Sequence, residues 1–162
     1  MPVNKHVSVL GYCWGDALQA GYFKWHGPAL RMVGVDTDVN HLALRFGNWI
    51  VHPFSDNKIK WVKDSVSDRC FGQPCRELYI GESFRNLGEA VNEGKRHETI
   101  TWTCYAWFYT LGMYKNKRDC VSWVKNMLAF TNNIPKLPCQ TPSCLLKELE
   151  NHGYGILRSR GD

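Results

Sequence analysis

The sequence of 162 residues contains no apolar run that approaches the length of a membrane span. Its first residues lack the charged and then apolar layout of a signal peptide. Internal repeats, linker-like stretches and low-complexity segments are also missing. These absences predict a single domain over residues 1–162, without a membrane span, that resides in the cytoplasm of its host.

Strong charge of one sign is missing too. Lys and Arg total 20 against 15 Asp and Glu, which gives a formal net charge of +5. Apart from a short run at 115–118, the basic residues are spread along the chain. This bias is too weak to indicate a nucleic-acid-binding surface, so we expect no nucleic acid partner. The sequence carries no signature of an oligomeric state.

The seven cysteines are an odd number in a chain that is not short, so we expect no disulfide framework. Two cysteine pairs, Cys70 with Cys75 and Cys139 with Cys144, each bracket a loop that contains proline. Four thiolates are a ligand set that structural zinc accepts. A non-enzymatic binding module stabilised by zinc is therefore one alternative for this chain.

Aromatic residues are abundant, with seven each of Trp, Tyr and Phe. Together with the β-branched residues they form short runs that are typical of strands. Periodicity and capping residues predict helices in other stretches. Strands are predicted at 6–13, 31–35, 58–62, 77–80, from 98 towards 109 and at 154–158, and helices at 84–93, 117–130 and 144–151.

A β-hairpin is predicted around Gly47, because the Gly-Asn pair lies between two apolar, β-favouring runs. A two-residue loop places Phe46 opposite Trp49. In that register His41 and His52 lie on one face of the hairpin, as diagonal neighbours about 7–8 Å apart. A loop longer by one residue would turn His52 to the other face.

The helix predicted at 117–130 has Cys120 in its first turn, after Asp119, an N-cap residue type. Val121, Val124 and Leu128 form an apolar face that should pack into a core. Unpaired backbone N–H groups and the positive end of the helix dipole lower the pKa of a thiol at such a position. The alternative is that Cys120 is simply a small, half-buried apolar residue.

These residues together supply the parts of a nucleophilic site. Cys120 is the candidate nucleophile, His41 the candidate base, and His52 the candidate residue that orients the base. The backbone N–H of Cys120 would form part of an oxyanion hole. No cofactor or metal is needed for this chemistry. The structural alternative is that His41 is a satisfied strand histidine and that His52 merely ends its strand.

The order of these motifs resembles a known superfamily. A histidine that opens NHLALRF, a second histidine in the next strand and a later helix that starts DCVSWV are similar to the circularly permuted branch of the NlpC-type papain-like thiol hydrolases, which includes the lecithin:retinol acyltransferase group. The resemblance implies an α+β fold with a small antiparallel sheet packed on the cysteine helix. It also implies a thiol peptidase or acyl transferase that forms an acyl-enzyme on Cys120, with a peptide or other acyl-bearing substrate.

A second cysteine and histidine allow a different enzyme. Cys13, in GYCWGD, and His152, in NHGYG, have the order of ordinary papain enzymes, with the cysteine early and the histidine late. Gly15 follows Cys13 closely, which weakens the helix expected after a papain-type nucleophile. This papain-order cysteine protease remains an alternative to the permuted one.

Overall fold

A computed structural model describes residues 5–13, 39–53, 59–63, 73–96, 120–139 and 141–159. The predicted strand at 31–35, the segment 98–109, Asp119 and Cys70 lie outside these residues. Within them the protein is a mixed α+β fold, with one six-stranded sheet and three helices. None of the described helices is long and apolar enough to cross a membrane.

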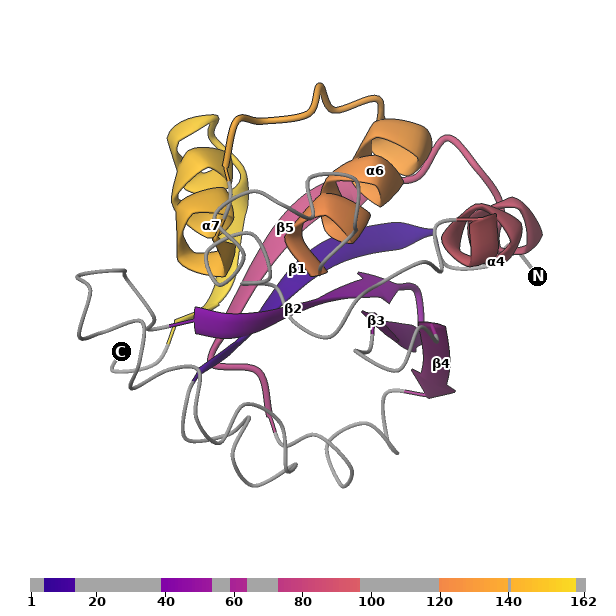
Figure 1. The fold of residues 1–162 in the computed structure, drawn as a ribbon, viewed down its shortest axis with the longest axis horizontal. Helices are drawn as coiled ribbons and strands as arrows, with labels where there is room; N and C mark the ends of the chain where they lie inside the picture. The colour runs from indigo at the N-terminus through magenta and orange to yellow at the C-terminus, as the bar shows by residue number, and fades with distance from the viewer. Residues whose placement is uncertain are drawn as a thin grey trace, which may run out of the picture.

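Every neighbouring pair of strands in the sheet is antiparallel, and the strand order is β4-β3-β2-β1-β5-β6 (Figure 1). The predicted antiparallel sheet is thus confirmed, and the last strand forms an edge as expected. The strands are β1 (His6–Cys13), β2 (Val39–Phe46), β3 (Trp49–Pro53), β4 (Ile59–Lys63), β5 (Arg76–Glu82) and β6 (Gly155–Ser159).

The hairpin between β2 and β3 has the predicted register, with Phe46 paired to Trp49 across the turn. Gly47 has φ of 61°, in the left-handed region that glycine adopts without a steric penalty. The turn residue therefore sets the pairing of both strands.

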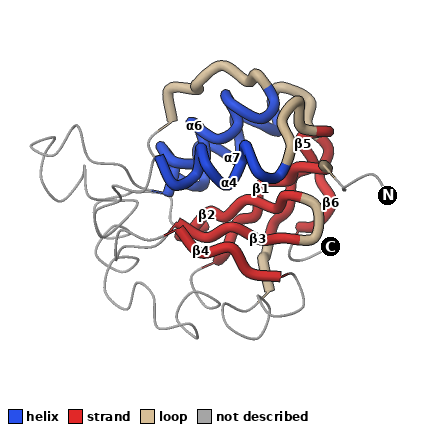
Figure 2. The backbone as a smooth tube through the Cα atoms, turned by 90° about the vertical axis from the view of Figure 1, so that its right-hand side faces the viewer, coloured by secondary structure: helices blue, strands red, loops and turns tan. Residues whose placement is uncertain are grey.

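The described helices cover one face of the sheet (Figure 2). They are α4 (Leu87–Arg96), α6 (Cys120–Asn132) and α7 (Pro142–Asn151). The predicted helix start at Cys120 is confirmed, and Val121, Val124 and Leu128 are all buried as expected. Gly11 allows α7 to approach β1, because a Cβ there would lie 2.8 Å from Leu146 Cδ1.

The helix predicted at 144–151 implies an N-cap at Ser143, and this cap position is wrong by two residues. Thr141, not Ser143, is the N-cap of α7, and its side chain accepts a hydrogen bond from the Cys144 N–H. The Ser143 hydroxyl instead accepts a hydrogen bond of 3.1 Å from the backbone N–H of Val39. The Ser143 hydroxyl therefore ties α7 to the start of β2.

Apolar side chains form two separate clusters, one on each face of the sheet. The larger, which we call the helix-side core, joins α4, α6 and α7 to the sheet; it includes Val7, Val9, Leu42, Leu44, Phe46, Val51, Leu78, Ala90, Cys120, Val121, Trp123, Val124, Met127, Leu128, Leu145, Leu146 and Leu149. The smaller, which we call the far-side cluster, consists of Leu10, Tyr12, Ala43 and Ile50. Strand alternation assigns neighbouring residues of β1 and β2 to opposite clusters.

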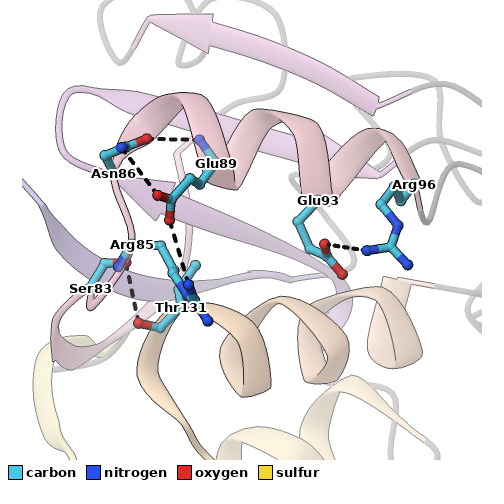
Figure 3. Close-up of polar contacts among 7 residues, drawn as sticks. All are labelled: Ser83, Arg85, Asn86, Glu89, Glu93, Arg96 and Thr131. Carbon is cyan, nitrogen blue, oxygen red and sulfur yellow. Dashed lines mark hydrogen bonds and ion pairs between the residues drawn. The ribbon is translucent and has the colours of Figure 1, made fainter.

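Hydrogen bonds after β5 fix the direction of α6 (Figure 3). The Thr131 carbonyl, in the last turn of α6, accepts from the Phe84 N–H at 2.7 Å and from the Ser83 hydroxyl at 3.2 Å. Asn86 caps α4 by accepting from the Glu89 N–H at 2.8 Å. The last turn of α6 is thus fastened beside the end of β5.

This anchoring decides which end of the sheet receives Cys120. The end of β5 pairs with the start of β1, and the start of β1 pairs with the end of β2 at Phe46. The last turn of α6 therefore lies near the end of β2. Because the rest of α6 packs along β2, the helix runs in the same direction as that strand. A helix of 13 residues is roughly 20 Å long, so its first residue points towards the end of the sheet where β2 begins.

Candidate active site

Cys120 is the first residue of α6 and carries a free thiol. Its side chain is only 3% exposed and belongs to the helix-side core. Among the described residues its sulfur makes no hydrogen bond. The position has the backbone N–H groups that the sequence predicts for an oxyanion site, but the thiol itself is packed among apolar groups.

His41 is the third residue of β2 and pairs across the sheet with Tyr12. The two rings are in contact, with centroids 5.8 Å apart and planes inclined by 45°. Tyr12 is 1% exposed and belongs to the far-side cluster. The His41 ring therefore packs on the face of the sheet that looks away from α6.

The predicted nucleophile and base consequently lie at the same end of the sheet but on opposite faces. Leu42, the next residue after His41, contributes to the helix-side core together with Cys120. Alternation along β2 then directs the imidazole to the other side. The structure does not bring the Cys120 sulfur and the His41 ring into contact.

Burial lowers the pKa of His41 to about 4, because the charged imidazolium loses its hydration. The ring is therefore neutral at pH 7. A neutral imidazole is the form that accepts a proton, and it is also the form that packs best beside an aromatic ring in a poorly hydrated position.

His52 lies in β3, where its backbone pairs with Lys60 of β4. Extending the β2–β3 register by one residue beyond the pair Leu44 and Val51 places His52 opposite Ala43, as the sequence predicts. The side chain of His52 lies outside the described part of the structure. Its predicted role in orienting His41 stays a prediction.

The two residues of the papain-order alternative occupy different settings. Cys13 is the last residue of strand β1. His152 is exposed at the end of α7, where its Nδ1 lies 2.7 Å from the Glu148 carbonyl oxygen. That contact gives His152 a structural role at the end of the helix.

The alternative of a four-cysteine zinc site conflicts with the state of Cys75, which is bonded in a disulfide. The expectation that there is no disulfide framework therefore has to allow for at least this one disulfide. A disulfide sulfur is not a thiolate ligand, so a four-cysteine site would require this bond to be reduced. Within the described part of the chain, no three metal-ligating side chains are grouped for a metal ion.

Sequence reasoning missed a row of polar residues on the far face of the sheet. Arg45 and Glu77 form an ion pair of 2.6 Å, mostly shielded from water. Ser8 pairs with Arg45 in the β1–β2 register and is itself buried. His41 and Arg45 are four positions apart in one strand, so the alternation of HLALRF already indicated that they share a face.

Comparison with protein-family models, with curated proteins and with solved structures finds no match for this chain. Neither the fold nor the candidate site is therefore assigned by similarity.

Proposed function

We propose that the chain is a cysteine-nucleophile hydrolase, a thiol peptidase or a related acyl transferase that works through an acyl-enzyme on Cys120. The observation that carries the proposal is that Cys120 is the first residue of a helix packed on β2. That helix start lies towards the end of the sheet where β2 carries His41. The residue order also resembles permuted papain-like enzymes.

In the proposed reaction the sulfur of Cys120 attacks an acyl carbonyl, and His41 takes the thiol proton. The first-turn N–H groups of α6 stabilise the negative oxygen that develops on the carbonyl. The same imidazole then returns the proton to the leaving group. A peptide or another acyl-bearing molecule is the expected substrate class, and water or a second acceptor completes the cycle.

This chemistry requires the start of β2 to rearrange, because the His41 ring contacts Tyr12 on the face of the sheet opposite to Cys120. The β1–β2 register shifts between Tyr12 and Cys13, directly beside His41. Irregularities of this kind re-aim side chains near active sites. Substrate binding would supply the free energy for the change, as binding energy does in induced fit.

An acyl-trapping experiment tests the proposal. The protein is incubated with an activated acyl ester, quenched with acid and digested with trypsin. The peptide 119–125 contains Cys120 as its only cysteine, and the peptide 6–24 contains only Cys13. We expect the acyl group on 119–125, and no acyl-enzyme in the Cys120→Ala variant. Acylation of 6–24 instead would support the papain-order alternative and overturn the proposal.

The role of His41 needs its own matched control. His41→Gln should lower the rate of acylation, whereas His6→Gln should leave it unchanged. His6 is also a strand histidine, but it is exposed and its Nδ1 lies 2.7 Å from the Tyr79 hydroxyl. Equal rates in both variants would remove the proposed base while leaving the nucleophile to be judged from Cys120→Ala.

A further inference from the structure

Two further cysteines, Cys139 and Cys144, lie in the loop before α7 and at the start of this helix. The sulfurs of Cys139 and Cys144 are 2.7 Å apart, and both are free thiols. A formed disulfide has a sulfur–sulfur distance of about 2.05 Å, so little movement is needed to close the bond. The separation of the two sulfurs is therefore not what prevents this pair from forming a bond.

The two thiols differ in access. Cys139 is 1% exposed and belongs to the helix-side core, whereas Cys144 is half-buried in the first turn of α7. Burial, together with the neighbouring Cys144 thiol, raises the pKa of Cys139 to about 12. Cys144 therefore has the position of an attacking thiol, and Cys139 that of a thiol that acts second.

The loop between α6 and α7 is held so that the pair stays aligned. The Lys125 ammonium donates hydrogen bonds to the Leu137 carbonyl at 3.1 Å and to the Cys139 carbonyl at 2.7 Å. On the other side of the loop, the Thr141 hydroxyl caps α7 at the Cys144 N–H. Both ends of the six-residue segment are thus fixed before any covalent bond forms.

We propose that Cys139 and Cys144 form a reversible thiol–disulfide site whose co-reactant is a low-molecular-weight disulfide such as glutathione disulfide. The Cys144 thiolate attacks one sulfur of the co-reactant and displaces one thiolate. Cys139, after losing its proton, attacks the Cys144 sulfur and displaces the second. The protein pair is oxidised by two electrons, the co-reactant is reduced to two thiols, and these thiols carry the two protons.

Closing this bond would join the loop 133–141 covalently to α7. The site is independent of the proposed hydrolase chemistry, because it uses neither Cys120 nor His41. Two cysteines that do not gather a third ligand are better suited to a dithiol than to a structural zinc ion. Among the described residues no third metal-ligating side chain joins them.

Peptide mapping of the whole protein tests the site. The protein is equilibrated with mixtures of reduced and oxidised glutathione, quenched with an alkylating reagent and digested with trypsin. The peptide 137–147 contains both cysteines and no other. We expect this peptide to lose two hydrogens and to escape alkylation. A peptide that stays fully alkylated, or that stops as a lasting glutathione adduct, would overturn the proposal.

Single substitutions identify which thiol reacts first. Cys139→Ser should accumulate a glutathione adduct on Cys144 at least about tenfold faster than Cys144→Ser accumulates one on Cys139, because only Cys144 is accessible. The opposite order would overturn the assignment. The wild-type peptide decides whether the bond forms, even if a variant at the buried Cys139 fails to fold.

Lys125→Met tests the positioning of the loop. Loss of its two hydrogen bonds should lower the ratio of disulfide to dithiol about three- to tenfold at a fixed glutathione ratio. Lys136→Met is the matched control, since Lys136 is an exposed lysine of the same loop. Its tryptic peptide extends back to residue 126 but contains the same two cysteines. Equal ratios in the two variants would overturn the role given to Lys125.

Discussion

The starts of α6 and α7 each carry a cysteine in the first helical turn, yet the two thiols have different surroundings. Cys120 is packed in the helix-side core without a hydrogen bond to any described residue. Cys144 is half-buried and lies 2.7 Å from a second sulfur. A position at a helix start therefore does not by itself determine the reactivity of a cysteine. The groups that other elements place beside the thiol determine it.

The difference follows from what each helix packs against. The last turn of α6 is fastened beside β5, which lays its first turn across the apolar face of β2. The first turn of α7 instead follows a loop that Lys125 draws back towards α6. The Cys120 thiol therefore packs against the sheet, whereas the Cys144 thiol contacts Cys139 in the loop that precedes α7.

The largest effect is expected for Cys120→Ala in the acyl-transfer assay. Removal of a catalytic nucleophile lowers turnover by about 10⁴-fold or more, because the covalent route is lost. Cys144→Ala should leave turnover unchanged, since the α7 start has no part in that reaction. Rates measured with the activated ester compare the two helix starts directly. Equal losses of turnover in Cys120→Ala and Cys144→Ala would contradict the distinct roles given to the two helix starts.

Trp123→Ala should destabilise the α6 side by about 3–5 kcal/mol in the free energy of unfolding. Trp123 is fully buried, and its Nε1 donates a hydrogen bond of 3.3 Å to the Gly94 carbonyl, which joins α6 to α4. Lys147→Ala on the exposed side of α7 should change the same quantity by less than about 0.5 kcal/mol. Chemical denaturation monitored by circular dichroism measures both. A loss below about 1 kcal/mol for Trp123→Ala would contradict the packing described for α6.

The pH dependence of stability should report on His41. Its pKa is 6.5 in the unfolded chain and about 4 in the folded protein, so between these values the unfolded state binds more protons. Stability should therefore fall as the pH is lowered from 6.5 to about 4, by up to about 3 kcal/mol, and this contribution should be constant above 6.5. His41→Gln should flatten that slope, and His6→Gln should not. A slope that is unchanged in His41→Gln would contradict the half-buried position of the His41 ring beside Tyr12.

Thr141→Ala should cause a smaller loss than Trp123→Ala, about 1 kcal/mol in the free energy of unfolding, because the Cys144 N–H loses its cap. Ser143→Ala tests the alternative cap and should instead weaken the contact between α7 and β2 at Val39. Backbone hydrogen exchange at Cys144 separates the two. Faster exchange there in Ser143→Ala than in Thr141→Ala would reverse the assignment of the cap.

Local signals in the sequence predict local structure well in this protein. The Gly-Asn pair sets the β2–β3 register because Gly47 adopts a left-handed turn conformation. The apolar face of 117–130 likewise predicts the burial of Val121, Val124 and Leu128, although Trp123 and Thr131 are buried as well. Both outcomes depend only on residues within a few positions of one another.

The candidate site is harder to predict, because it depends on which face of β2 the helices cover. The sequence places His41 and Arg45 on one face and Leu42 and Leu44 on the other, but it does not say which face receives α6. Packing of α6 on Leu42 and Leu44 decides that question. The cap of α7 illustrates the same limit, since the hydroxyl of Ser143 is used by a residue 104 positions away.

The most direct test of the proposed function is the rate at which an electrophile modifies Cys120 at pH 7, followed in the peptide 119–125. We predict that His41→Gln slows this modification about 10²-fold or more, as expected for loss of a general base, while His6→Gln leaves it at the wild-type rate. An unchanged rate in His41→Gln would contradict the pairing of Cys120 with His41.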